Sequence, residues 1–282
     1  MAKSREVSVA ICTSREPVPG CLDALREQVP PERLVVVGSG GGAGDLVEPR
    51  PGLSHARNRA LCWAAESGAA ILAFVDDDAI AEPGWYEALA RRWNEAPAEV
   101  ACIGGPIRPR FAADPPPWYS DAIRHVLTLL DRGPEVRDLD PDSEAVYGAN
   151  ISFAVGPLRE AGGFDPALGH SGTRVFFGEE DEAQRELVKR GYRVRYVPDA
   201  AVWHVIPPSR LTRGSFLRRR FAFGVSLGMR GGRERGLAAR RAAKGIAGAL
   251  AARDPKLRMD RAVRAAENAG ALYGSIRPRR IA

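Results

Sequence analysis

Short apolar runs alternate with helical stretches through the first hundred residues, and this alternation restricts the fold more than any other feature of the chain. Buried strands are predicted at residues 7–12 (VSVAIC), 34–37 (LVVV) and 70–75 (AILAFV). Helices are expected between them, at 21–28 and 55–67, and after the third strand from Pro83-Gly84-Trp85 to about Asn94. This order predicts an α/β fold with a mostly parallel sheet flanked by helices on both faces.

Polar or glycine-rich loops follow each of the three strands. They are Thr13-Ser14-Arg15, the loop from Gly38 to Gly44, and the triplet Asp76-Asp77-Asp78. Parallel strands end at the same edge of a sheet, where ligands of doubly wound folds bind. The sequence therefore predicts a ligand site at this edge.

The triplet Asp76-Asp77-Asp78 follows a wholly apolar strand. Three neighbouring carboxylates are costly to hold together unless a cation or hydrogen-bond donors balance them. Mg²⁺ and Mn²⁺ take carboxylate oxygens and leave positions for phosphate oxygens. In an extended backbone Asp76 and Asp78 can point to one side and Asp77 to the other. The alternative is that these residues only cap the following turn.

A second acidic cluster, Glu179-Glu180-Asp181-Glu182, begins a predicted helix that ends at Gly191. Acidic residues are common at helix starts because the helix dipole stabilises them, so a purely structural role is the alternative. His204 comes at the far end of the last predicted strand, Arg193 to Val197, which continues towards Val202-Trp203-His204. Its imidazole could add a nitrogen ligand to a Mn²⁺-like metal.

The middle of the chain is less regular. Pro106, Pro109 and Pro115-Pro116-Pro117 predict a loop, residues 146–153 a strand, and 157–162 a short helix; the residues beyond Pro207-Pro208 are expected to be helical. The expected organisation has three segments: residues 1–105, residues 106–206 and a basic helical extension at 207–282.

Charge is distributed unevenly between these segments. Residues 207–282 contain 19 Lys and Arg against 4 Asp and Glu, whereas residues 1–206 contain 22 against 31. A basic extension of this kind fits phosphates, a membrane surface, nucleic acid or a dimer contact.

The start of the chain does not have the pattern of a signal peptide, and no apolar run reaches the length of a membrane span. A cytoplasmic location is therefore expected, and the basic extension would allow peripheral contact with the inner membrane face. Cys12, Cys21, Cys62 and Cys102 form no CxxC pair, so reduced, packed thiols are expected.

Five segments, in order, resemble glycosyltransferase family 2, whose members have the GT-A fold and usually invert the anomeric centre. VSVAICTSRE resembles the family's first strand and nucleotide loop, GLSHARNRAL the segment before the metal strand, and FVDDDAIAEPGWYEAL its DxD region. YGANISFAVGPLREAGGFDPALG resembles the acceptor-side block, and GEEDEAQRELVKRGYRVRYVPDAAVWH the ED-motif helix, strand and histidine. The resemblance runs from about Val7 to His204.

The resemblance implies an inverting, hexosyltransferase-type enzyme that moves a sugar from a nucleoside diphosphate sugar, with UDP-sugars favoured, to a hydroxyl of a small-molecule, lipid-linked or glycan acceptor. Mg²⁺ or Mn²⁺ would be held by Asp78, Asp76 and His204. The base would be Glu180, where the family more often has Asp, with Glu179 and Asp181 as rivals. The donor site would include Thr13, Arg15, Arg57, Asp76 and Asp77, with Asn150 and Trp85 at the sugar or acceptor. Residues 1–105 would be the nucleotide-sugar-binding half of the GT-A domain and 106–206 the acceptor-binding half. Apart from the resemblance, Arg219, in the basic run Arg218-Arg219-Arg220, could close over the diphosphate, or this run could be a solvated helix face.

Two departures and three alternatives accompany this interpretation. Glu180 replaces the usual Asp, and Gly38-Ser39 lacks the Asp that commonly follows the family's second strand and helps to recognise the nucleotide base.

A nucleotidyltransferase is an alternative, but Cys12-Thr13-Ser14-Arg15-Glu16-Pro17 is not the glycine-rich basic loop of such enzymes. A non-catalytic binding module is less consistent with two intact acidic clusters, and no aromatic-basic motif supports a nucleic-acid binder.

Overall fold

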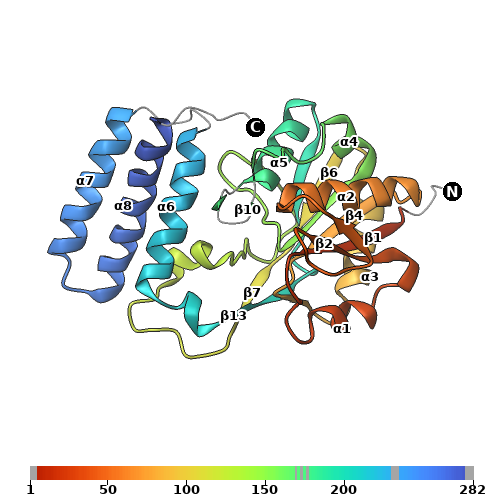
Figure 1. Ribbon diagram of the computed structural model, residues 1–282, viewed down its shortest axis with the longest axis horizontal. Coiled ribbons are helices and arrows are strands. Elements are labelled where there is room, and N and C mark those ends of the chain that lie inside the picture. Colours follow the sequence, from red (N-terminus) through yellow and green to blue (C-terminus); the bar gives the residue numbers. More distant parts are fainter. Residues whose placement is uncertain (1–4, 169, 172–173, 176–177, 230–234, 277–282) are drawn as a thin grey trace. The chain divides into compact units, whose positions relative to one another are not determined.

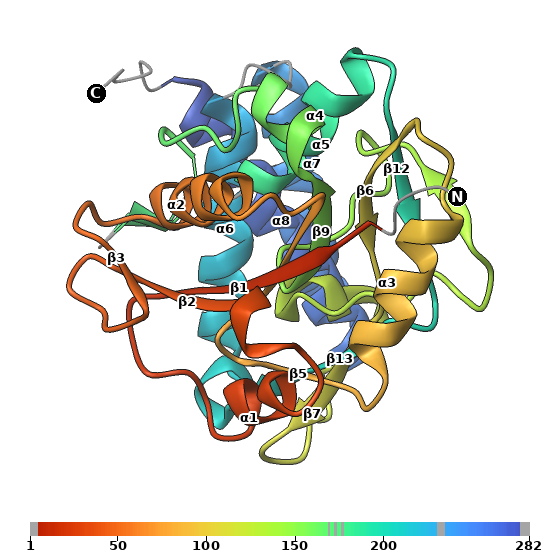
Figure 2. The same ribbon diagram turned by 90° about the vertical axis from the view of Figure 1, so that its right-hand side faces the viewer.

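The structure is a computed structural model that describes residues 5–168, 170–171, 174–175, 178–229 and 235–276 (Figures 1 and 2). The chain forms two compact units. The first comprises Met1–Pro109, Leu129–Thr173 and Glu179–Val205, and the second Arg110–Thr128, Arg174–Gly178 and Ile206–Ala282. The first unit therefore includes 1–105 and most of 106–206. The assignment of these two segments to donor and acceptor remains a prediction.

An eight-stranded sheet forms the centre of the first unit, in the order β3-β2-β1-β4-β9-β6-β12-β8. The strands are β1 (Val7–Thr13), β2 (Leu34–Ser39), β3 (Leu46–Glu48), β4 (Ile71–Val75), β6 (Val100–Gly104), β8 (Arg137–Leu139), β9 (Asn150–Ala154) and β12 (Arg193–Tyr196). Strands β3, β2, β1 and β4 run parallel, as do β6 and β12, while β9 is antiparallel to both β4 and β6 and β8 is antiparallel to β12. The predicted α/β fold is confirmed, with an antiparallel strand at the centre of the sheet.

Helices cover both faces of this sheet, as the alternating pattern predicts (Figures 1 and 2). On one face lie α2 (Leu53–Glu66), α4 (Val155–Glu160) and α5 (Glu179–Lys189), and on the other α1 (Cys21–Arg26) and α3 (Trp85–Glu95). A short 3-10 helix, η1 (Pro31–Arg33), precedes β2. Because both faces are covered, β1, β4 and β6 are buried along their whole length and consist almost entirely of small and branched apolar residues.

A smaller antiparallel pairing lies beyond the end of β4. Strand β5 (Ala79–Ala81) follows the aspartate triplet and pairs with β13 (Val202–Ile206), with His204 opposite Ala79. The backbone N–H of Val205 also donates to the Asp78 carbonyl at 2.9 Å. This pairing brings the end of the predicted last strand to the triplet.

Three phenylalanine rings pack edge to face in the core of the first unit. Phe74 of β4, Phe153 of β9 and Phe164 contact one another with ring centroids 5.5–6.4 Å apart. The guanidinium of Arg57, on α2, lies over Phe74 and Phe164 at 5.5 and 5.6 Å from the ring centroids. The sheet and α2 are thus joined around a buried arginine.

The second unit is mainly helical. It contains η2 (Asp121–Leu127), η3 (Pro208–Arg210), α6 (Arg213–Met229), α7 (Arg235–Ala251), α8 (Pro255–Ser275) and the short β11 (Arg174–Val175). Helix α8 lies between α6 and α7 (Figure 1). Gly224 and Gly228 on α6 and Gly270 and Gly274 on α8 allow close packing, because a Cβ on any of them would come within 2.0–2.2 Å of a backbone oxygen of the facing helix.

Several elements differ from those predicted. Residues 106–117 are not only a loop, because Ile107–Phe111 form β7, on which the chain passes from the first unit to the second. The single last strand is two strands, β12 and β13, in different sheets. The acidic helix starts at Glu179, and Phe177 lies outside the described residues; the remaining short strand is β10 (His170–Ser171). All four cysteines are free, as expected, although Cys62 is exposed rather than packed.

Candidate functional site

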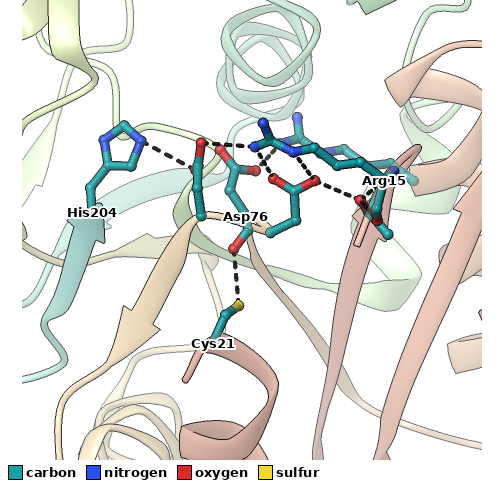
Figure 3. Close-up of polar contacts among 8 residues, drawn as sticks. Arg15, Cys21, Asp76 and His204 are labelled. Atoms are coloured by element: carbon teal, nitrogen blue, oxygen red, sulfur yellow. Dashed lines mark hydrogen bonds and ion pairs between the residues drawn. The ribbon is translucent and has the colours of Figure 1, made fainter. Parts of the chain in front are cut away.

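The aspartate triplet lies between β4 and β5, and its three carboxylates have different partners (Figure 3). Asp77 accepts from Arg15 Nε at 3.0 Å and Nη2 at 2.6 Å, and Arg15 Nη2 also donates to Asp78 at 3.1 Å. Asp76 faces Arg57 at 3.6 Å. The simple alternation of side chains does not hold, because Asp77 and Asp78 share one guanidinium and Asp76 is directed to another.

Thr13 is the last residue of β1 and Arg15 follows the strand; both lie beside the triplet, as their position at the end of a parallel strand predicts. The Thr13 hydroxyl is 2.5 Å from an Asp77 oxygen and accepts from the Arg15 backbone N–H at 3.1 Å. Arg15 remains half exposed, with 55% of its side chain accessible. It is therefore a cation that neutralises Asp77 and Asp78 and is open to solvent.

His204 lies directly against Asp78. Its side chain is buried on β13, and Nε2 is 3.2 Å from Asp78 Oδ1 (Figure 3). The pairing of β5 with β13 fixes this approach, since it joins the backbones at Ala79 and His204 and at Asp78 and Val205. Two of the three predicted metal ligands are thus adjacent.

The second acidic cluster reaches the first through Arg57. Arg57 Nη1 donates to Glu179 at 2.8 Å and lies 3.6 Å from a Glu180 oxygen, and Nη2 faces Asp76 at 3.6 Å. Arg57 and Glu179 are almost completely buried, whereas 19% of the Glu180 side chain is accessible. The structure brings together acids more than a hundred residues apart, and their common partner is Arg57.

Burial and the charge of Arg57 give these carboxyl groups different pKa values. Burial raises the pKa of Asp76 to about 6, against the opposing effect of Arg57. Burial and the neighbouring Glu180 raise the pKa of Glu179 well above its ordinary value. Burial also acts against the charged form of Glu180, but Arg57 and hydrogen bonds from its own backbone, from the Glu179 carboxyl and from the Gly148 backbone lower its pKa. Glu179 is therefore the protonated member of the pair and Glu180 the charged one.

Asn150 is predicted to contact the sugar or acceptor, and in the structure its side-chain amide is bonded within the protein. The side chain is buried at the start of β9, where Nδ2 donates to the carbonyls of Pro106 and Ala200 at 3.0 and 2.8 Å. Its oxygen accepts from Trp85 Nε1 at 3.0 Å. Both amide hydrogens are used within the protein, so these contacts describe a structural link between β9, α3 and two loops.

The remaining predicted residues lie in separate places. Asp181 is the third residue of α5 and is partly exposed. Arg219 belongs to α6 of the second unit, where its Nε donates to the Val126 carbonyl at 3.1 Å. The predicted roles of both residues remain predictions.

Two features of the site were not evident in the sequence. Gly148 leaves room for Arg57, since a Cβ there would lie 2.2 Å from Arg57 Nη2. Glu48 of β3 lies opposite Ser39 of β2 and is buried, so a carboxylate is present beside the strand end where the family's usual Asp is missing. Its oxygens accept from Arg50 at 2.7 and 3.0 Å. Neither feature has a local signal, because each depends on a residue from another element.

The triplet fits a divalent cation only in part. Among the residues that the structure describes, no group of three or more His, Cys, Asp and Glu side chains is arranged to hold a metal ion. Asp78 and His204 nevertheless form an adjacent carboxylate and imidazole pair, a donor set suited to Mn²⁺. A cation held by this pair would need oxygens from a bound ligand, as Mg²⁺ sites in phosphate-binding enzymes commonly do.

Comparison with known proteins identifies relatives for part of the chain and for its fold. Residues 45–118 match the family model described as "Glycosyl transferase family 2". A glucosyl-dolichyl phosphate glucuronosyltransferase of Haloferax volcanii is 32% identical over 160 residues, which cover 54% of this chain and 47% of the relative. The chain thus spans about half the length of this curated relative.

Two solved structures share the fold at low sequence identity. The mannosyltransferase PcManGT from Pyrobaculum calidifontis, in complex with GDP-Man and Mn²⁺, has a TM-score of 0.53 and 19% identity over 96% of this chain and 75% of its own. GalNAc-T7 with UDP, GalNAc and Mn²⁺ has a TM-score of 0.52 and 16% identity over 78% of this chain and 48% of its own. Both are GT-A glycosyltransferases. Residues 45–118 are thus similar to glycosyltransferase family 2, and the chain has the GT-A fold of these two structures.

Proposed function

We propose that this chain transfers a sugar from a nucleoside diphosphate sugar to an acceptor hydroxyl, with inversion at the anomeric carbon. The observation that carries the proposal is the convergence of two acidic clusters on Arg57, one from the end of β4 and one from the start of α5. Donor activation and acceptor deprotonation require acids with different strengths, and the two clusters supply them.

The triplet is the proposed donor side. Asp78 and His204, with Asp76 nearby, would hold Mg²⁺ or Mn²⁺, which supplies Lewis-acid stabilisation of charge on the departing nucleoside diphosphate. Arg15 lies at the same carboxylates and is half exposed, so its guanidinium is accessible to a phosphate oxygen. Both GT-A neighbours were solved with Mn²⁺ and a nucleotide ligand, which supports a metal and a nucleotide here.

Glu180 is the proposed base. Of the Arg57-bound glutamates it is the more accessible, and its pKa is lowered, so it is charged and able to accept a proton from the attacking hydroxyl. Glu179 is buried, and its raised pKa keeps it protonated, which suits a supporting hydrogen bond to Glu180 better than proton abstraction. Asp181 is the remaining rival.

The donor and acceptor classes are proposed from the sequence resemblance and from the names of similar proteins. A UDP-sugar is the favoured donor from the sequence resemblance, and the neighbours' titles name UDP in one case and GDP-Man in the other. The name of the curated relative identifies its acceptor as a sugar on a dolichyl phosphate. A lipid-linked sugar is therefore the acceptor class to test first, ahead of small molecules and free glycans.

A donor screen tests the proposal. Wild-type protein and Asp78→Ala are incubated with UDP- and GDP-sugars, Mn²⁺ and candidate acceptors, and products are detected by mass spectrometry. Thermal unfolding measured with each donor reports binding independently, because a ligand specific to the native state raises the melting temperature. We expect one donor class to stabilise the wild type and Asp78→Ala to lose both this shift and transfer. The absence of any shift with every donor rules out the enzyme proposal, and full activity of Asp78→Ala rules out the metal assignment.

A further inference from the structure

Helix α7 of the second unit carries an unbalanced basic surface. Its sequence contains no Asp or Glu, and Arg240, Arg241 and Lys244 are all exposed. The acids described on the neighbouring helix α8 have other partners. Glu267 pairs with Arg220 at 2.5 Å, Asp260 accepts from Ser120 at 2.6 Å, and Asp254 caps the start of α8. The positive charge of α7 is therefore exposed on the protein surface.

Exposed apolar side chains accompany these charges. Leu250, near the end of α7, is 81% exposed, Ile246 one turn earlier is 53% exposed, and Leu257, in the first turn of α8, is 41% exposed. Arg253, in the turn between the helices, and Lys256, in the first turn of α8, are exposed as well. Single exposed apolar residues are ordinary on a protein surface, but several beside a basic patch form a surface suited to a partner.

The packing of α7 leaves most of its circumference available. Its buried residues are Ala238 and Ala242, and Gly245 and Gly248 allow close approach to Ala265 and Arg261 of α8. Helix α8 lies between α6 and α7, so α7 is covered from the side of α8 (Figure 1). By helical spacing Arg240 and Lys244 lie on the side away from α8, among small Ala and Gly side chains, and Arg241 lies at the flank beside α8.

We propose that the outer side of α7 and the α7–α8 turn form a docking surface for a bilayer that contains anionic lipid. Arg240, Arg241 and Lys244 would lie over the headgroups, and Leu250 and Leu257 would enter the boundary with the acyl chains. Nucleic acid would satisfy the charges but would leave these leucines in water, which favours the bilayer. The contact is peripheral, since no helix in the described part of the chain has the length and apolar composition of a membrane span.

Vesicle co-sedimentation of the full chain tests this surface without any donor or acceptor, so its result is independent of the proposed catalysis. Vesicles of phosphatidylcholine alone are compared with vesicles that also contain phosphatidylglycerol. We expect binding to the anionic vesicles only, with partitioning of Arg240→Gln/Arg241→Gln/Lys244→Gln weaker on the order of 100-fold, at about one kilocalorie per basic residue. Leu250→Ser is expected to weaken partitioning about tenfold without any change in charge.

The matched control is Arg26→Gln/Lys189→Gln/Arg190→Gln, which removes the same charge from exposed positions of the first unit. It should bind like the wild type, and circular dichroism should show all variants folded. Failure of the wild type to bind anionic vesicles at low ionic strength overturns the proposal. So does an equal loss in the control triple variant. Unchanged binding of Leu250→Ser, together with competition by RNA, would assign the surface to nucleic acid and likewise overturn it.

Discussion

Arg57 is the residue on which the candidate site depends most. A buried guanidinium is costly unless its charge and its N–H donors are matched. Here Glu180 and Asp76 supply the charge, Glu179 accepts a hydrogen bond from the guanidinium, and the rings of Phe74 and Phe164 supply favourable faces. The sequence places Arg57 at the nucleotide, whereas in the structure it joins the two acidic clusters. Removing it would leave buried carboxyls without their cation.

Replacement of Arg57 by Met therefore has a predictable effect on stability. We expect Arg57→Met to lower the free energy of unfolding by about 3–5 kcal/mol, the usual cost of breaking a buried ion pair from one side. Urea denaturation measures this change. Arg59→Met, two residues along the same helix and partly exposed, is the control and should change stability by less than about 0.5 kcal/mol. Adding Glu180→Gln to Arg57→Met should restore part of the loss, because it removes a charge left without its cation, and a further loss would contradict this explanation.

Gly148 offers a second test of the position of Arg57. A Cβ at this position would lie 2.2 Å from Arg57 Nη2, so Gly148→Ala must displace the guanidinium from the glutamates. We expect destabilisation of about 1–3 kcal/mol by thermal unfolding, together with a lower transfer rate. Gly156→Ala is the control, because nothing lies within 4 Å of a Cβ there and alanine favours the helix. Equal stability of the two variants would show that Arg57 has freedom to move.

At the scale of elements, the sequence predicts the strands better than their directions. The apolar runs at 7–12, 34–37 and 70–75 lie in β1, β2 and β4, because a strand buried on both faces needs a continuous apolar run. The same pattern does not distinguish a parallel from an antiparallel neighbour, so the direction of β9 between β4 and β6 was not predictable. Strand β7 was missed because Pro109 lies within it, and proline is compatible with strands only at edges or bulges.

Helix packing in the second unit gives a prediction about α6 and α8. A Cβ on Gly270 would lie 2.0 Å from the Phe221 backbone oxygen, and backbone cannot move away as a flexible side chain can. Gly270→Ala is expected to destabilise the protein by about 1–3 kcal/mol in chemical denaturation. Gly236→Ala on α7, with nothing within 4 Å of its Cβ, should be neutral or slightly stabilising. A neutral Gly270→Ala would contradict the close packing of these helices.

His125 in η2 predicts how stability depends on pH. Burial, reinforced by Arg220, lowers the pKa of His125 from 6.5 to about 4. Between these two values the unfolded chain binds a proton that the native chain does not, so stability must fall as pH drops from about 6.5 to about 4. The loss attributable to this group is up to about 3 kcal/mol. Denaturation at several pH values should show a shallower decline for His125→Gln, and an unchanged slope would contradict the assignment.

Across the whole molecule, the sequence predicts contacts between strand ends more reliably than contacts that depend on distant residues. Thr13, Arg15 and Asp78 assemble because β1 and β4 end at one edge of the sheet, and the pairing of β5 with β13 adds His204. Asn150 and Arg57 differ, since their burial depends on distant residues: Trp85 and two loop carbonyls for Asn150, and α5 for Arg57. The difference in charge between residues 1–206 and residues 207–282 is evident from the sequence, but the exposure of α7 is not.

The central claim is that the cluster on α5 performs chemistry and the triplet binds the donor. The most direct test measures Glu180→Gln in two ways, by calorimetric titration of the donor with Mn²⁺ and by the rate of sugar transfer. Loss of a base should reduce transfer about 10²- to 10⁴-fold, and donor affinity should stay within about twofold of the wild type. Transfer at the wild-type rate, or a parallel loss of donor binding, would contradict the assignment of Glu180 as the base.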